Sequence, residues 1–233
     1  MSDYPPPPPP PPVPPAYGGA EAQPADIGPA FSYAWRKFSQ YAGPLILVTL
    51  VVLVGYMALS GVQIVLNSSG DFGFGRFILW VVLSGITALV GFALEYGIVR
   101  ASLAVVEGRE PTFAEAWNLE RFGPFIVAAI LRGILVFVGL LLCIIPGLII
   151  WFLTIFTPFY VIDKNLAPTE AIANSIALVR RHAGKLILFC LVAWLVYLLG
   201  AIVCFVGLLV SIPVAMVAAA YMYRRIQDES VAS

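Results

Sequence analysis

Long apolar segments without charge alternate with short polar segments over most of this chain. Four segments contain no charged residue: 43–66, 77–94, 133–162 and 186–223. A helix needs about 20 residues to cross the ~30 Å hydrocarbon core of a bilayer. The first two segments therefore predict one membrane-spanning helix each, and the last two, which are too long for one span, predict a helical hairpin each. Six transmembrane helices result; four spans with re-entrant loops are the alternative.

The two predicted hairpins share a string, Phe-Val-Gly-Leu-Leu, at 137–141 and 205–209. A turn at Pro213 would leave about 16 Å of helix before Arg224, which is too short to cross. The prolines instead suit the start of the returning helix, where a missing N–H is tolerated. We expect turns within 139–146 and 200–207, marked by Gly139, Pro146, Gly147, Gly207 and Pro213.

The composition agrees with a membrane protein. Hydrophobic residues make up 61% of the 233 residues, charged residues 11%, and the mean hydropathy is +0.94. Soluble domains contain about 45–50% apolar and about 25% charged residues. The 13 basic and 13 acidic residues balance, so no overall charge favours nucleic acid. We expect an all-α, polytopic domain at 26–227 and a short cytoplasmic tail at 228–233.

Residues 1–25 differ from the rest of the chain. Pro5 to Pro12 are eight consecutive prolines, and proline has no N–H and a fixed φ. The segment predicts a disordered tail with polyproline II character. It is interpreted either as a docking ligand for a cytoplasmic protein with an aromatic-lined groove or as a solvated spacer.

The basic residues lie mostly on one side of the predicted membrane domain. Arg76 lies on the other side, and Arg132 lies within a span. Under the positive-inside rule the basic side is cytoplasmic, which predicts a multi-pass protein of the plasma (inner) membrane with both termini inside. The other 11 basic residues are Arg36, Lys37, Arg100, Arg109, Arg121, Lys164, Arg180, Arg181, Lys185, Arg224 and Arg225.

Three polar segments, 27–47, 111–127 and 168–188, precede the odd-numbered spans and resemble one another. Each predicts a short amphipathic helix at the membrane interface, with Phe31, Trp35 and Phe38 forming the apolar stripe of the first. Gly43, Gly123 and Gly184 would end these helices as left-handed caps. The unit of interfacial helix plus hairpin would thus occur three times, unless the matches are accidental. Contacts with anionic lipid are expected from Trp35, Arg36, Lys37, Arg121, Arg180, Arg181 and Lys185.

Glu95 and Arg132 are the ionisable residues that lie well inside the apolar segments. A charge at the centre of a bilayer costs at least ~2.5–3.5 kcal/mol on insertion scales. Spans 2 and 3 are consecutive and antiparallel, so the two side chains can pair. The pair is interpreted either as a structural clamp or as part of a gate, an ion site or a lipid-headgroup contact.

Signatures of catalysis and of metal binding are absent from the sequence. His182 is the single histidine, and Cys143, Cys190 and Cys204 lie in apolar segments without a CxxC spacing. No P-loop, GxSxG or GxGxxG is present. We expect no enzyme activity, no catalytic residue, no metal and no cofactor.

Several strings resemble those of a broad group of bacterial multi-pass membrane proteins of unknown function. They are GIVRASLAVVEGREPTFAEAW at 97–117, the glycine- and proline-marked hairpin at 139–147, and APTEAIANSIALVRRHAGKL at 167–186. The chain is similar to the membrane domain attached to some glycerophosphodiester phosphodiesterases, and its tail looks like those of actinobacterial membrane proteins. The resemblance implies a membrane domain over 27–226 and supplies no catalytic residues.

Two functions follow as hypotheses. The first is a non-enzymatic envelope scaffold or accessory factor, whose tail docks a partner and whose basic helices hold anionic lipid. The alternative is a small transporter or channel for a lipid-like or small solute that uses Glu95 and Arg132. A cavity that reaches either residue would favour transport, whereas a core packed solid with side chains would favour the scaffold.

Overall fold

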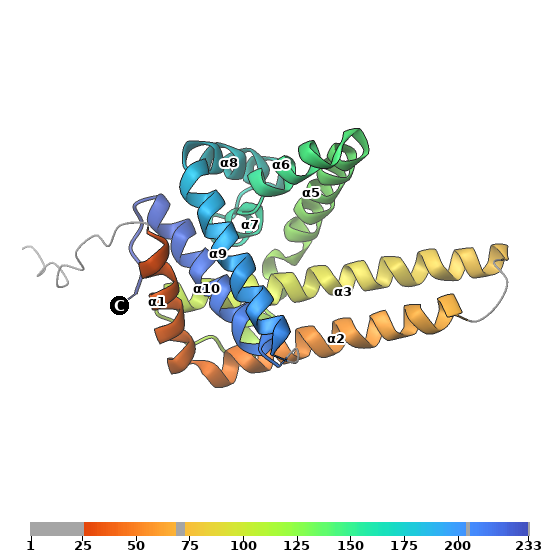
Figure 1. The fold of residues 1–233 in the computed structure, drawn as a ribbon, viewed down its shortest axis with the longest axis horizontal. Coiled ribbons are helices and arrows are strands. Elements are labelled where there is room, and N and C mark those ends of the chain that lie inside the picture. The colour runs from red at the N-terminus through yellow and green to blue at the C-terminus, as the bar shows by residue number, and fades with distance from the viewer. Residues whose placement is uncertain (1–25, 69–72, 204–205, 233) are drawn as a thin grey trace, which may run out of the picture.

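The computed structural model describes residues 26–68, 73–203 and 206–232, so the predicted proline-rich tail lies outside it. The secondary structure of the described residues is entirely helical, which confirms the predicted all-α class (Figure 1). The helices are α1 (Ile27–Gln40), α2 (Ala42–Ser68), α3 (Phe74–Val106), α4 (Phe113–Ala116), the 3₁₀ helix η1 (Leu119–Arg121), α5 (Phe122–Leu142), α6 (Ile144–Leu153), α7 (Thr157–Asp163), α8 (Pro168–Arg181), α9 (Ala183–Ile202) and α10 (Leu208–Ile226).

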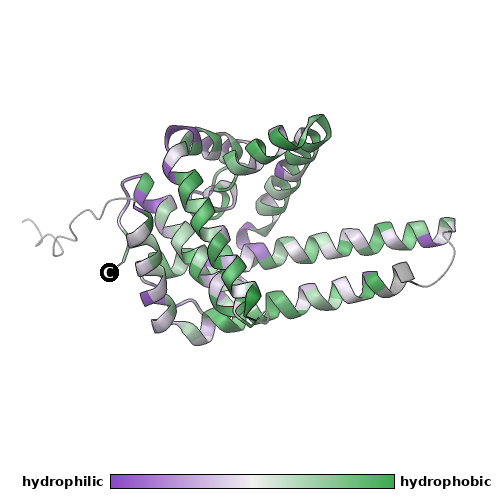
Figure 2. Cartoon of the chain, viewed as in Figure 1, coloured by the Kyte–Doolittle hydropathy of each residue, from purple (hydrophilic) through white to green (hydrophobic). Residues whose placement is uncertain are grey.

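Six helical segments of the described chain are long and apolar enough to cross a membrane. This agrees with the prediction of six spans and not with the alternative of four. Figure 2 shows hydrophobic residues along most of the α2–α3 hairpin, which extends away from the rest of the molecule. Apolar surface on this scale is rare on a soluble monomer. The segments are Ala42–Ile64, Phe74–Val106, Phe113–Leu142, Ile144–Asp163, Ala183–Ile202 and Leu208–Ile226.

The turns of the second and third hairpins lie within the predicted intervals. The chain reverses at the extended residue Cys143 (φ −175°, ψ 159°), between α5 and α6, and again between α9 and α10. Glycines face each other beside both turns. A Cβ built on Gly139 would lie 2.9 Å from the Cα of Gly147, and one built on Gly207 would lie 2.8 Å from the Cα of Gly200. Glycine therefore allows the two arms of each hairpin to approach closely.

A single residue makes each corner before an odd-numbered span; it lies between two helices at the first and third corners and is the last residue of η1 at the second. Tyr41 (φ −117°, ψ 31°), Arg121 (φ −108°, ψ 11°) and His182 (φ −121°, ψ 25°) share nearly the same conformation. The predicted left-handed glycine caps are therefore wrong at these corners. Each of these glycines is instead the second residue of the following helix. The chain already turns at the corner residue, whose φ is negative and is therefore accessible to any amino acid.

Left-handed residues occur instead at the ends of the even-numbered spans. Gly108 (φ 78°), Asn165 (φ 55°) and Asp228 (φ 58°) are the residues with positive φ in the described part of the chain. They follow α3, α7 and α10, each two residues after the last helical position. At Gly108 and Asp228 the hydrogen bonds are those of a Schellman motif. A left-handed residue at this position thus occurs once in each of the three units.

The amphipathic segments repeat less regularly than the corners. In the second unit the expected continuous helix is wrong, because α4 ends after four residues and η1 follows. The Thr112 and Asn118 side chains accept hydrogen bonds from the backbone N–H groups of Glu115 and Glu120, both at 3.2 Å. Such local side-chain caps start new short helices and compete with one long helix.

α1 and α8 are both 14 residues long and share four buried positions counted back from their corner residues. The predicted stripe of α1 is rotated from the observed one, since Trp35 is 58% exposed. Small alanines face the protein because they allow α1 to lie close to its neighbour. The matching buried residues are Ala30, Ala34, Lys37 and Phe38 in α1 and Ala171, Ser175, Leu178 and Val179 in α8.

The three units close into a ring. α4 packs against α3, α8 against α7, and α1 against α10, so each amphipathic segment contacts the even-numbered span of the unit before it. At the closing contact the Tyr33 and Tyr221 ring centroids lie 4.9 Å apart, and the Tyr33 hydroxyl donates to the carbonyl of Val105 at 3.4 Å. The three hairpins diverge from this shared base and do not form a parallel bundle (Figure 1).

Candidate functional site

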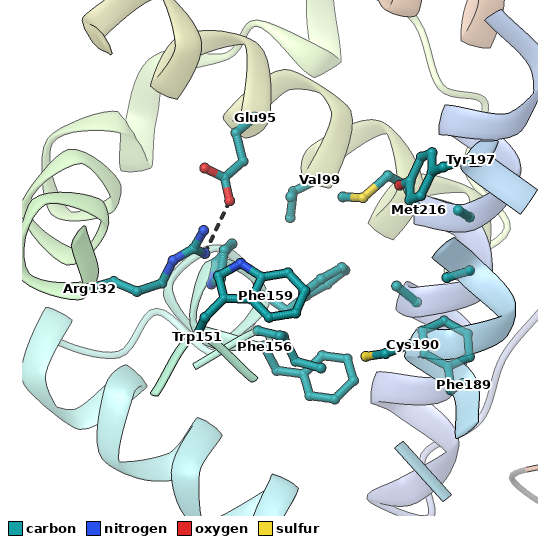
Figure 3. A pocket seen from close by; sticks show the side chains of 15 residues that line it. Glu95, Val99, Arg132, Trp151, Phe156, Phe159, Phe189, Cys190, Tyr197 and Met216 are labelled. Carbon is teal, nitrogen blue, oxygen red and sulfur yellow. Dashed lines mark hydrogen bonds and ion pairs between the residues drawn. The ribbon is translucent and has the colours of Figure 1, made fainter. Parts of the chain in front are cut away.

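Glu95 on α3 and Arg132 on α5 point toward each other across the interior of the molecule (Figure 3). The Arg132 Nη1 atom lies 3.2 Å from the Glu95 Oε1 atom, which is both a hydrogen bond and an ion pair. The structure therefore brings together the two charges that the sequence placed within apolar spans. Pairing lowers the cost of holding each charge away from water.

The pair lines a cavity of about 210 Å³. The exposed fractions of the two charged side chains, 22% for Arg132 and 31% for Glu95, show that neither is sealed in the core. The rest of the wall is mainly apolar and aromatic and comes from all three units. It includes Val99 of α3, Trp151, Phe156 and Phe159 of the second unit, Cys190 and Tyr197 of α9, and Met216 of α10 (Figure 3).

The fourth span is broken where it borders this cavity. α6 ends at Leu153 and α7 begins at Thr157, and Trp151 and Phe156 on either side of the break line the cavity. Pro158 occupies the first turn of α7, where its missing N–H is tolerated. Discontinuous helices in membrane proteins occur where the backbone is covered by protein or lines a cavity. The observed break satisfies both conditions.

Ser175 of α8 supports the break. Its hydroxyl donates to the Leu153 carbonyl at 2.9 Å and accepts from the Phe156 N–H at 3.2 Å. These are backbone groups that the interrupted helix leaves without their usual partners. Ser175 is fully buried, so its hydroxyl bonds to these backbone groups and not to solvent. A side chain from the third unit therefore fixes the geometry of a cavity wall in the second.

A second, much smaller cavity of about 10 Å³ lies behind Arg132, with Thr157 and Pro158 in its wall. The Thr157 hydroxyl is buried and has no hydrogen-bond partner within the described residues. A space of this size is close to the ~10–15 Å³ that one water molecule requires.

The predicted lipid-contact residues divide into two groups. Lys37 was expected on the polar face of α1, but only 5% of it is exposed, so its assignment as a lipid contact is wrong. Burial, with a smaller effect of Arg36, lowers the pKa of Lys37. Arg121 bonds to Asn165 and is half-buried. Lipid contact stays a prediction for the exposed residues, which are Trp35, Arg36, Arg180, Arg181 and Lys185.

The sequence did not indicate a charged cluster at the ends of α3, α7 and α10. Arg224 forms ion pairs with Glu107, Asp163 and Glu229, the last at 3.3 Å between Nη1 and Oε2. Lys164 lies 3.5 Å from Asp163 and also contacts Glu229. We call these five residues the Arg224 cluster.

The sequence does contain a pattern that relates to the cluster: an acidic residue ends each even-numbered span or follows it closely. Its residues are up to 122 positions apart in the chain, so only the tertiary fold could show that they meet. Glu229 also shows that the tail predicted as separate at 228–233 is not independent of the membrane domain. The N–H of Ala232 in that tail donates to the Val106 carbonyl at 2.9 Å.

The fold and the cavity define the class of protein: a multi-pass α-helical membrane protein with six candidate spans, built from three similar units around a partly charged cavity. Its relatives narrow this further. The chain is 30% identical over 226 residues to the uncharacterized proteins Rv2560 and MT2637 of Mycobacterium tuberculosis and Mb2590 of Mycobacterium bovis, covering 88% of this chain and 70% of each relative. The chain belongs to the family of these mycobacterial proteins.

No family model matches the chain, and no solved structure matches it. The names of the mycobacterial relatives do not mention a glycerophosphodiester phosphodiesterase. The resemblance to the membrane domain of those enzymes therefore stays a prediction from the sequence.

Proposed function

We propose that this protein is a non-enzymatic membrane carrier of the transporter type, which binds a lipid-like amphiphile in the cavity beside Glu95 and Arg132. The observation that carries the proposal is the cavity of about 210 Å³ with an ion pair in an otherwise mainly apolar wall. An amphiphile matches this wall, because its chain can pack on aromatic and aliphatic side chains while its polar group reaches Arg132.

The size of the cavity limits the cargo. Pockets for drug-sized ligands measure about 300–1,000 Å³, so this one holds a small solute or a single acyl chain in part. Arg132 has five N–H donors, one of which is used by the hydrogen bond to Glu95. A carboxylate on the cargo could therefore bind Arg132 beside Glu95 or in its place. A single-chain fatty acid has both properties.

The broken fourth span supports a carrier independently of the charges. Binding sites in many transporters are formed by discontinuous helices between structural repeats. Here the break at 154–156 borders the cavity, and the wall combines residues of three similar units.

Photolabelling with a fatty acid that carries a diazirine in its acyl chain tests the proposal. We expect adducts on cavity residues of the purified protein in lipid nanodiscs, mapped by peptide mass spectrometry. Ala193→Trp should fill the cavity and remove these adducts. Leu195→Trp is the matched control, because Leu195 lies on the same helix, is 44% exposed and does not line the cavity. Equal labelling of the cavity in both variants would refute the proposal.

The scaffold hypothesis remains a separate candidate that depends on the tail at 1–25. Deletion of residues 1–25 distinguishes the two functions. A scaffold would lose its co-purifying proteins, whereas a carrier would keep the cavity adducts of the fatty-acid probe.

A further inference from the structure

One end of the cavity is closed by two successive layers of side chains. The first layer is aromatic: Phe156 and Phe159, which line the cavity, lie with their ring centroids 5.8 Å and 5.3 Å from that of Tyr223. Tyr160 completes this layer, at 5.1 Å from Tyr223. These rings separate the cavity from the ends of α7 and α10.

The second layer is the Arg224 cluster, and the Tyr223 hydroxyl links the two. It donates a hydrogen bond of 3.2 Å to Asp163, whose other carboxylate oxygen contacts Arg224. Arg224 in turn pairs with Glu107 from the first unit and Glu229 from the third, while Asp163 belongs to the second. One guanidinium therefore joins the ends of the even-numbered spans of all three units.

We propose that the aromatic layer and the Arg224 cluster form a gate that closes this end of the cavity. The inference rests on the proposed carrier function and describes how its site is reached. α3, α7 and α10 all contribute to the cavity wall before they reach the cluster. Separation of their ends would open the cavity toward the side where these helices end.

The chemistry of the cluster suits a gate better than a permanent closure. Apolar side chains would hold three helix ends together at least as well, because buried ion pairs are often no more stabilising than apolar packing of the same volume. When the three helix ends separate, water solvates charged side chains well, whereas it would not solvate apolar side chains in the same place. Both the closed and the open arrangement are then accessible, which a gate requires.

Cys190 is a natural reporter for this gate, because it lines the cavity. In a Cys143→Ser, Cys204→Ser background it is the single thiol of the chain. The protein is reconstituted into vesicles, and a membrane-impermeant reagent, methanethiosulfonate ethyltrimethylammonium, is added from either side. Protease cleavage of a C-terminal tag identifies the side on which α10 ends.

We expect Arg224→Gln to raise the rate of Cys190 labelling about tenfold or more from the side of the C-terminus, because charge-assisted hydrogen bonds that hold the closed state are lost. Arg225→Gln is the matched control: it removes the same charge from the next residue, whose contact is a cation–π interaction with Tyr221 and not an ion pair with the cluster. Its labelling rate should equal that of the parent protein.

Glu107→Gln provides a second variant in case Arg224→Gln does not fold, since Glu107 is more exposed than Arg224. It should give a smaller increase from the same side, with Glu110→Gln, at a nearby exposed acid, as its control. An unchanged rate in the folded variants, an equal increase in the controls, or an increase from the opposite side would overturn the gate. Labelling of Cys190 does not require cargo. Absence of the fatty-acid adducts would therefore refute the carrier function, while the labelling rates of Cys190 would still test the gate.

Discussion

At the scale of single residues, the chain places charge where the surrounding side chains are apolar and compensates it by pairing. Glu95 and Arg132 share one ion pair beside the cavity, and Arg224 holds three carboxylates at the ends of three helices. Lys37 is buried in α1 at the position that Leu178 occupies in α8. Substitution of any one of these residues therefore tests whether its charge stabilises the fold or serves the function of the cavity.

A double-mutant cycle measures the coupling of Glu95 and Arg132. Glu95→Gln and Arg132→Gln should each lower the free energy of unfolding by about 1–3 kcal/mol, because each leaves a charge without its partner. The double variant should be less destabilised than the sum of the two, with a coupling of about 0.5–3 kcal/mol. Thermal unfolding of the purified proteins in detergent provides the measurement. Additive effects would show that the two residues are not coupled.

Lys37→Leu tests the burial of a cation in α1. Because burial lowers the pKa of Lys37 below its ordinary value of 10.5, the unfolded chain binds this proton more tightly than the folded chain. The wild type should therefore gain stability relative to Lys37→Leu as the pH rises through the lowered pKa toward 10.5. Unfolding curves of both proteins over this range check the sign. Arg180→Leu, at an exposed position of α8, should show no such difference.

At the scale of elements, the irregular segments are fixed by other parts of the chain. The break between α6 and α7 depends on a serine from α8, and the short helices α4 and η1 begin at their own side-chain caps. The corners before α2, α5 and α9 each need a single residue. The regular spans themselves follow from apolar length alone.

Ser175→Ala should destabilise the broken span. The substitution leaves a buried carbonyl and a buried N–H without a partner, which costs about 1–3 kcal/mol for each such group. We also expect fewer fatty-acid adducts on Trp151, because the cavity wall at the break would shift. Asn174→Ala on the exposed face of the same helix serves as control and should change stability by less than about 0.5 kcal/mol. Equal effects of the two substitutions would contradict the role of Ser175.

At the scale of the whole molecule, the three units depend on one another through a closed ring. Each amphipathic segment covers the even-numbered span of the preceding unit, and α1 closes the ring on α10. The cavity and the Arg224 cluster both lie where the units meet, so neither exists within a single unit. Helix α1 therefore contributes to the stability of α10, against which it packs.

Deletion of residues 1–40 tests this closure. It removes α1, including Tyr33 and its contact with Tyr221, and exposes the buried face of α10. We expect a lower melting temperature and faster protease cleavage near α10. Deletion of residues 1–25 is the matched control, since it leaves α1 in place, and should keep the melting temperature of the full chain. Identical melting of both truncated proteins would show that the ring is not needed for stability.

The features that depend on local pattern were predictable. The spans follow from uncharged length, the turn regions from glycine and proline, and the Glu95–Arg132 pair from two charges on consecutive antiparallel helices. The apolar stripe of α1 and the position of Lys37 were not, because a hydrophobic pattern indicates which side chains avoid water but not how closely a neighbouring helix approaches. Alanine allows that approach, and its pattern carries little signal.

The sequence by itself therefore determined an all-helical membrane protein with six candidate spans and a threefold pattern, since length, hydropathy and turn residues act locally along the chain. The tertiary structure decided which units touch, where the fourth span breaks around Ser175, and that Glu107, Asp163 and Arg224 meet. These features depend on contacts between residues far apart in the chain, and such contacts form only when the helices pack together.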